Sequence, residues 1–252
     1  MGFDVAAEAY DQFMGRWSRQ LAPQLADFAG LHAGQQVLDV GCGPGALTEV
    51  LAERLGVAGV AAVDPSESFV AAARTRVPGV DVRQAAAERL PFPDGAFDAT
   101  LASLVVHFMA DPVAGLAEMA RVTRSGGVSA ACVWDFEGGR GPLGPFWEEA
   151  RELDPDVIDE SRLAGTRRGH LAELFAAAGH RDIEEGTLAA SREYASFDDW
   201  WGPFTRGVGP AGAYVAALGP EHQAALRGRC RSMLPAGRFV LTAHAWVARG
   251  LT

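Results

Sequence analysis

Residues 37–48, VLDVGCGPGALT, decide the fold of this chain. An apolar strand ends beside an acidic residue, a glycine-rich turn follows, and a helix begins near Ala46. Gly41 and Gly43 let the backbone turn tightly and approach a ligand where a Cβ would clash. The helix directs its free N–H groups and the positive end of its dipole at the same ligand. The stretch therefore predicts a binding site for a nucleotide-like cofactor.

Two kinds of cofactor fit this loop. The pattern Gly41-x-Gly43-x-x-Ala46 also matches the dinucleotide fingerprint, with Asp64 near the place of its ribose-binding acid. Asp39 discriminates, because a carboxylate at the strand end repels a pyrophosphate but suits the ammonium and sulfonium of S-adenosylmethionine. The alternative for Asp39 is a cap on the N–H groups of the loop. Asp64 ends the next apolar run and suits the ribose hydroxyls of either cofactor.

Apolar runs and turns alternate along the chain as in a doubly wound α/β fold. Predicted strands lie near 36–40, 59–64, 80–84, 97–102 and 128–134, with helices near 18–28, 45–55, 66–76, 113–123 and 169–178. Two further alternating runs lie near 182–194 and 238–248. This arrangement puts the cofactor at the carboxyl ends of the first two strands.

Four motifs in order resemble the class I S-adenosylmethionine-dependent methyltransferases, in the small-molecule group related to ubiquinone and menaquinone biosynthesis. They are VLDVGCGPG, AAVDPS at 61–66, AAERLPFPDGAFDATLAS at 86–103 and RVTRSGG at 121–127, and the resemblance spans roughly residues 5–135. It implies a Rossmann-like seven-stranded sheet with an antiparallel last strand. The runs near 182–194 and 238–248 resemble the antiparallel sixth and seventh strands. The implied cofactor is S-adenosylmethionine, with S-adenosylhomocysteine as product.

The resemblance also implies roles for single residues. Gly41 and its neighbours contact the methionine part, Asp64 binds the ribose hydroxyls, and Ser103 lies near the amino group. The remaining implied cofactor residues, with Asp39 beside them, are Cys42, Gly43, Pro65, Ser66, Ala86 and Ala87.

One departure concerns the adenine. Relatives usually have Gly-Asp-Ala where this chain has Ala85, Ala86 and Ala87, so the Asp that accepts from the adenine amino group is absent. Losing one such hydrogen bond costs about 0.5–1.5 kcal/mol and does not abolish binding. Gln84 or Glu88 could compensate.

The segment 9–28 is expected to be a helical cover over the cofactor. Tyr10, Arg16 and Trp17 are the candidates to reach it, and Arg16 could pair with the methionine carboxylate in bidentate fashion. The alternative is that Phe13 and Trp17, spaced i and i+4, pack on the core.

Segments 135–162 and 197–235 are expected to determine the substrate, around the cofactor-binding core at 36–134 of a single domain 1–252. The second segment is rich in aromatic residues and predicts a helical lid over an apolar acceptor pocket. Its pocket candidates are Trp200, Trp201, Phe204 and Tyr214. A dimer contact or a satellite of the core is the alternative.

Catalysis on an activated methyl donor depends mainly on proximity and orientation. Where the acceptor is a phenol or an acidic carbon, a general base helps. His107, after the fourth strand, is the candidate base, with the alternative of a loop histidine beside the cofactor. Asp135 and Glu137 are further candidates.

Composition narrows the function class. The net charge of −10 argues against nucleic acid as a partner. The three cysteines, Cys42, Cys132 and Cys230, show neither metal spacing nor a disulfide framework, so a reducing cytoplasm is expected and no metal. Neither a signal peptide nor a membrane span is expected.

The sequence thus predicts methyl transfer to oxygen or carbon of a small hydrophobic molecule, with a homodimer left open. The rivals are a protein of this fold that binds the cofactor but catalyses another reaction such as a cyclisation, a non-catalytic binding protein, and a nicotinamide-dependent oxidoreductase. The acceptor cannot be read from the sequence.

Overall fold

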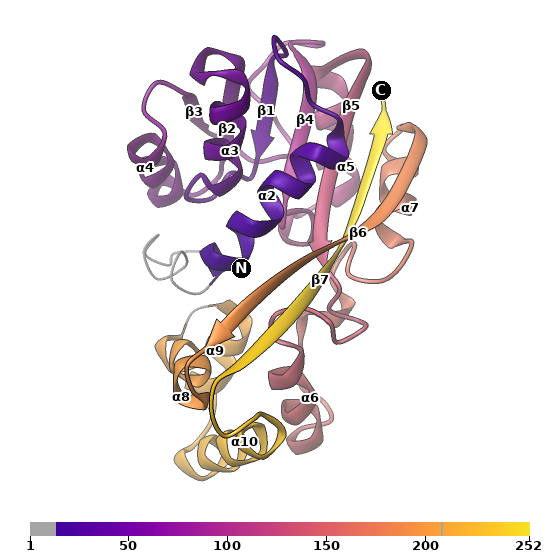
Figure 1. Cartoon of the computed structure of the whole chain (residues 1–252). Helices are drawn as coiled ribbons and strands as arrows, with labels where there is room; N and C mark the ends of the chain where they lie inside the picture. Colours follow the sequence, from indigo (N-terminus) through magenta and orange to yellow (C-terminus); the bar gives the residue numbers. More distant parts are fainter. Residues whose placement is uncertain (1–13, 208) are drawn as a thin grey trace.

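A computed structural model describes residues 14–207 and 209–252 of the chain. The centre of the fold is a seven-stranded sheet in the order β3-β2-β1-β4-β5-β7-β6 (Figure 1). Its strands are β1 (Val37–Val40), β2 (Val60–Asp64), β3 (Asp81–Gln84), β4 (Phe97–Ser103), β5 (Thr123–Trp134), β6 (Arg181–Tyr194) and β7 (Phe239–Leu251). The predicted Rossmann-like α/β sheet is confirmed.

Strand directions follow the expected pattern with one refinement. The first five strands pair in parallel, and β7 pairs antiparallel with both β5 and β6. The antiparallel last strand is therefore confirmed. The expectation that β6 and β7 both run antiparallel to the other strands is wrong for β6. Because β7 is antiparallel to both β5 and β6, β6 runs parallel to the first five strands. The strand order reverses beside β1, so a crevice opens at the carboxyl ends of β1 and β4.

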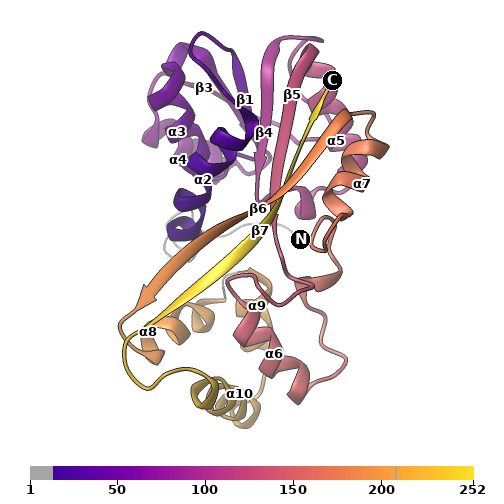
Figure 2. The same ribbon diagram turned by 45° about the vertical axis from the view of Figure 1, so that its right-hand side comes forward.

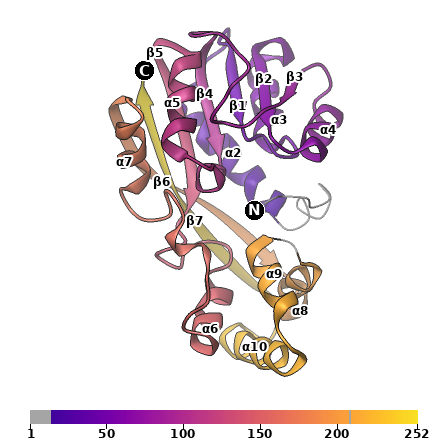
Figure 3. The same cartoon turned by 180° about the vertical axis from the view of Figure 1, so that it is seen from behind.

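Helices cover both faces of the sheet (Figure 3). One core cluster holds the buried side chains of α2 (Arg16–Ala29), α3 (Ala46–Leu55) and α4 (Glu67–Arg76). A second holds those of α5 (Pro112–Val122) and α7 (His170–Ala177). Because both faces are covered, β1 and β2 are buried along their whole length, as their continuous apolar runs predict.

The α2 helix also closes the free edge of β6. Gln20 Nε2 donates to Ser191 O (2.9 Å) and Gln20 Oε1 accepts from Ser191 N (3.0 Å). Gln24 repeats this with Ala189, at 2.8 and 3.3 Å. Two side-chain amides thus occupy backbone groups that an edge strand otherwise leaves open.

The carboxyl edge of the sheet carries a helical subdomain, which we define as α6 (Gly144–Leu153), α8 (Phe197–Trp201), α9 (Gly209–Ala217) and α10 (Pro220–Met233). The long arms of β6 and β7 extend beyond the other strands to reach it (Figure 2). Short 3-10 turns complete the chain: η2 (Val57–Gly59), η3 (Val106–Phe108), η4 (Glu160–Arg162) and η5 (Gly202–Arg206).

Aromatic side chains form the interior of this subdomain. Phe146 stacks on Phe204 with ring centroids 4.6 Å apart, and Trp200 meets Phe204 edge-on at 4.9 Å. Trp200, Trp201 and Phe204 are all buried, whereas Tyr214 is half-buried at the margin. The expected acceptor pocket of these aromatics is not what the structure presents. These aromatic rings pack against one another, which matches the alternative of a satellite of the core.

Candidate functional site

The glycine loop between β1 and α3 is held by the end of β2. The backbone N–H groups of Gly41 and Cys42 both donate to Val63 O, at 2.8 and 2.9 Å. Gly41 has φ +71° and lies against the side chain of Val105, so that an added Cβ would sit 2.2 Å from Val105 Cγ2. Only glycine fits this position, because the conformation is left-handed and the space is already filled.

Asp64 ties this loop to the next one. Its Oδ2 accepts from Gly43 N and its Oδ1 from Ser66 N, each at 2.9 Å. Ser66 is in turn the N-cap of α4 and accepts from Phe69 N. Burial raises the pKa of Asp64, while the two backbone donors act in the opposite direction. One carboxylate therefore positions both loops that border the crevice.

Asp39 is fully buried beneath the glycine loop. Thr48 Oγ1 donates to its Oδ2 at 2.6 Å, and its Oδ1 has no hydrogen-bond partner among the described residues. Desolvation raises the pKa of Asp39 to about 7, with the nearby Asp64 acting in the same direction. The capping role considered for Asp39 does not match these contacts, since its hydrogen-bond partner is Thr48 of α3 and not an N–H group of the loop.

This burial makes stability depend on pH. Because the folded pKa of Asp39 lies above the unfolded value, its contribution is fully present below about pH 4 and is lost as pH rises through about 7. We expect Asp39→Asn, which keeps an acceptor for Thr48, to remove this loss and to gain up to about 4 kcal/mol over wild type between pH 4 and pH 8. Urea unfolding of both proteins at the two pH values measures it. If the free energy of unfolding changes with pH in the same way in both proteins, the raised pKa of Asp39 is contradicted.

A cavity of about 870 Å³ opens beside these loops. The predicted cofactor residues that line it are Gly41, Gly43, Asp64, Pro65, Ser66, Ala86, Ala87 and Ser103. Asp39 and Cys42 lie in the layer beneath. Arg16 is exposed at the start of α2 and does not line this cavity, and Tyr10 lies outside the described residues. Trp17 packs edge-on against Trp134 with ring centroids 6.1 Å apart, as the core alternative expects.

The residues near Ala86 show what remains for an adenine ring. Gln84 lines the cavity and donates from Nε2 to Pro65 O at 2.9 Å, and no hydrogen bond involves its Oε1 among the described residues. Glu88 Oε1 is occupied by the backbone N–H groups of Ala110 and Asp111. Both residues considered as compensation for Ala86 line the cavity, and Gln84 Oε1 and Glu88 Oε2 each have no hydrogen bond among the described residues.

His107 is not placed to act as a base. Burial alone lowers its pKa to about 3, and its Nδ1 has no partner among the described residues. Its ring packs against Phe108 and Phe136, and it does not line the cavity. The imidazole is therefore a neutral, enclosed group at physiological pH, which corrects the expected role.

The other two candidates for a base also have different positions. Asp135 is buried and accepts from Gly138 N at 2.9 Å and from Arg140 Nε at 2.5 Å. It therefore shapes the turn after β5. Glu137 is exposed on that turn.

Sequence reasoning missed the wall of the cavity opposite Asp64. Leu104, Val105, Phe108 and Met109 line it directly after β4. Leu104 adopts φ +61°, a conformation that costs a residue with a bulky side chain about 1–3 kcal/mol. Its N–H donates to Cys132 O at 2.9 Å, which holds this turn against β5. No turn residue in the sequence marks the position.

Comparison with known proteins identifies the family. Residues 38–131 match the family described as methyltransferase domain. A demethylmenaquinone methyltransferase of Paenarthrobacter aurescens is 31% identical over 213 residues, which cover 74% of this chain and 80% of that protein. The chain belongs to the class I S-adenosylmethionine-dependent methyltransferases. Its cofactor is S-adenosylmethionine, and the expectation of a methyltransferase is confirmed.

Two further similar proteins match this methyltransferase less completely, one over a shorter length and one at lower sequence identity. A malonyl-[acyl-carrier protein] O-methyltransferase of Serratia marcescens is 36% identical over 126 residues, half of this chain and only 48% of that protein. A phosphoethanolamine N-methyltransferase 2 of Haemonchus contortus, solved with S-adenosylhomocysteine, shares the fold with a TM-score of 0.59 at 17% identity, over 98% of this chain and 56% of that one. No helix in the described part of the methyltransferase is long and apolar enough to cross a membrane.

The residues of the cavity fit the cofactor. The loop at Gly41 and Gly43 offers a close backbone approach, and the carboxylate of Asp64 lies at the wall. The unpartnered Oδ1 of Asp39 adds a negative charge below the loop when ionised, which favours a cationic ligand over a pyrophosphate.

Proposed function

We propose that this methyltransferase transfers a methyl group to an oxygen or carbon atom of a small, hydrophobic organic molecule. The observation that carries the proposal is the apolar wall of Leu104, Val105, Phe108 and Met109 where the cavity continues past Ser103. An apolar wall favours an acceptor that is itself largely apolar. A homodimer and the role of the helical subdomain as a lid remain predictions.

The side chains of this site support a mechanism of positioning. When bound, S-adenosylmethionine supplies an activated methyl group. Gly41 and Gly43 present backbone to the cofactor, Asp64 offers its remaining acceptor capacity, and the apolar wall excludes water. With His107 neutral and enclosed, the chain contributes orientation rather than a strong base, so the acceptor has to be a good nucleophile or to lose its proton readily.

Calorimetric titration with S-adenosylmethionine, S-adenosylhomocysteine and the nicotinamide dinucleotides tests the site first. We expect the two adenosyl ligands to bind with micromolar affinity and the dinucleotides not to bind, because the pyrophosphate would face Asp39 and Asp64. Preferential binding of a dinucleotide would overturn the interpretation of the loop.

Transfer of a labelled methyl group to a panel of acceptors tests the proposed substrate class. We expect label in phenols or acidic carbon compounds and none in phosphorylated or aliphatic amines of similar size. Label confined to the amines would contradict the proposal. Cofactor binding without label in any acceptor would favour the rival of a non-methylating reaction.

A further inference from the structure

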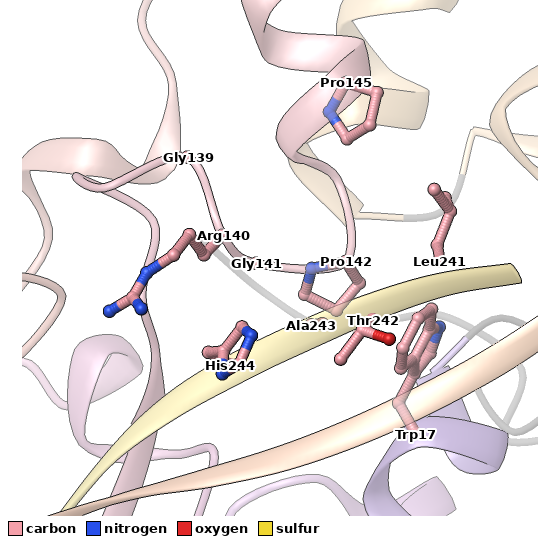
Figure 4. A pocket seen from close by; sticks show the side chains of 10 residues that line it. All are labelled: Trp17, Gly139, Arg140, Gly141, Pro142, Pro145, Leu241, Thr242, Ala243 and His244. Atoms are coloured by element: carbon pink, nitrogen blue, oxygen red, sulfur yellow. The ribbon is translucent and has the colours of Figure 1, made fainter. Parts of the chain in front are cut away.

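A second cavity of about 240 Å³ lies between the core and the helical subdomain (Figure 4). Trp17 of α2, Pro142 and Pro145 near the start of α6, and Leu241 of β7 give it apolar walls. Thr242 and His244 of β7 also line it. Three segments far apart in the sequence thus border one small space.

The backbone of Thr242 faces this cavity. Thr242 pairs with Ser191 of β6, but both backbone groups of Ser191 are bonded to Gln20 on the opposite side. The pair is therefore one of the non-hydrogen-bonded positions of an antiparallel ladder, which agrees with the 2.9 Å contact between their hydroxyl groups. The N–H and C=O of Thr242 consequently point away from β6.

His244, two residues after Thr242 on β7, shows that the backbone groups on this side point away from β6. His244 N donates to Arg140 O at 2.8 Å, and His244 O accepts from Asp135 N at 3.0 Å. Backbone groups two residues apart in a strand point to the same side. Thr242 thus presents one donor and one acceptor to the same edge, and no described residue forms a backbone hydrogen bond with either.

The cavity lies close to the cofactor site. Ser103, in the wall of the larger cavity, pairs with Cys132 of β5. Trp134 follows two residues later, about 7 Å along the strand, and contacts Trp17. Both cavities therefore lie at the carboxyl edge of neighbouring strands, separated by this aromatic pair.

The dimensions limit the occupant. A dry cavity of about 150 Å³ accommodates benzene, so a volume of about 240 Å³ suits one or two fused rings. The guanidinium of Arg140 is directed elsewhere, since its Nε is bonded to Asp135, its Cζ lies 5.3 Å from the centroid of the Trp246 ring, and the side chain extends away from Trp17 (Figure 4).

We propose that this cavity is a second ligand site, which binds a flat ring system that presents a hydrogen-bond acceptor and donor side by side, such as a lactam, to Thr242 N–H and C=O. Trp17 and the two prolines pack on the ring. The inference goes beyond the proposed function, because the two cavities share no lining residue. Binding itself is independent of methyl transfer.

The probe is 2-quinolone, a bicyclic lactam, measured by saturation-transfer NMR and calorimetry on the full chain loaded with S-adenosylhomocysteine. N-methyl-2-quinolone, which lacks the donor, is the matched control ligand. We expect 2-quinolone to bind about tenfold more tightly, because the control leaves Thr242 O unsatisfied. Equal binding of the two ligands would overturn the inference.

Thr242→Pro and Thr242→Val separate backbone from side chain. Proline removes the hydroxyl together with an N–H that points to the open edge, a position where strands tolerate it, whereas valine removes the hydroxyl and keeps that N–H. We expect about tenfold weaker binding of 2-quinolone to Thr242→Pro and wild-type binding to Thr242→Val. Similar affinities in both variants would overturn the inference.

The cofactor distinguishes the two proposals. S-adenosylhomocysteine should bind both variants as it binds wild type, because Thr242 lies outside the cofactor cavity. Binding of S-adenosylhomocysteine without 2-quinolone would refute the second ligand site and leave the methyltransferase proposal intact. Binding of 2-quinolone together with the absence of label from every acceptor of the panel would support the second ligand site and count against the proposed function.

Discussion

Gly41→Ala is expected to weaken binding of S-adenosylhomocysteine about a hundredfold, roughly 3 kcal/mol. The alanine has to adopt φ +71°, and its Cβ would lie 2.2 Å from Val105 Cγ2. The loop relieves this clash only by moving, and its movement disturbs the two N–H groups that Val63 O holds. Calorimetry on the purified variant measures the loss.

Two further variants show that the loss comes from the clash. Gly56→Ala has a similar φ of +79° but no atom within 4 Å of the added Cβ, so it should lose some stability and keep its affinity for the cofactor. Val105→Ala removes the two methyl groups at 2.2 and 2.9 Å but keeps the Cβ at 2.8 Å, so the double variant should regain part of the affinity. A double variant as weak as Gly41→Ala alone would refute the steric explanation.

Asp64→Ala is expected to reduce both cofactor affinity and stability. The substitution leaves the N–H groups of Gly43 and Ser66 without their acceptor, at about 1–3 kcal/mol each. It also removes the carboxylate from the cavity wall. We expect an affinity loss of about a hundredfold by calorimetry and a lower urea midpoint.

Asp98→Ala is the matched control for this prediction. Asp98 also accepts from a backbone N–H, that of Gln36 at 2.7 Å, and pairs with Arg124, but it lies at the opposite edge of the same sheet. It should lower stability and leave the dissociation constant unchanged. An Asp64→Ala protein that binds like Asp98→Ala would show that Asp64 has only a structural role.

The cofactor half of the molecule was predictable because its signals are local. A glycine loop between strand and helix, and an acid near the end of each of the first two strands, depend on neighbours in the sequence. The strands β1 to β4 consequently lie within a few residues of their predicted positions. The longer β5 begins at Thr123 because RVTRSGG continues the strand rather than preceding it.

The helical subdomain and its junction with the core were not predictable, because their properties depend on contacts between distant segments. The aromatic residues that follow Phe197 lie on helices, as the sequence predicts. Only the fold shows that Phe146 packs against Trp201 and Phe204. His107 follows the expected strand, yet its burial is set by Phe136. The open backbone of Thr242 depends on the pairing register of β6 with β7, which no local pattern specifies.

The two glutamines of α2 also determine where the molecule can bend. Gln20 and Gln24 fix β6 to the core up to Ser191, and the bonds of His244 fix β7 to the turn after β5. Beyond these anchors the two strands pair with each other and pack on the helical subdomain, and Tyr194 at the end of β6 still interacts with Trp17 of α2. We therefore expect a swing of the helical subdomain to break the contact between Tyr194 and Trp17 and to change the mouth of the smaller cavity, which Trp17 lines, while the cofactor loops stay still.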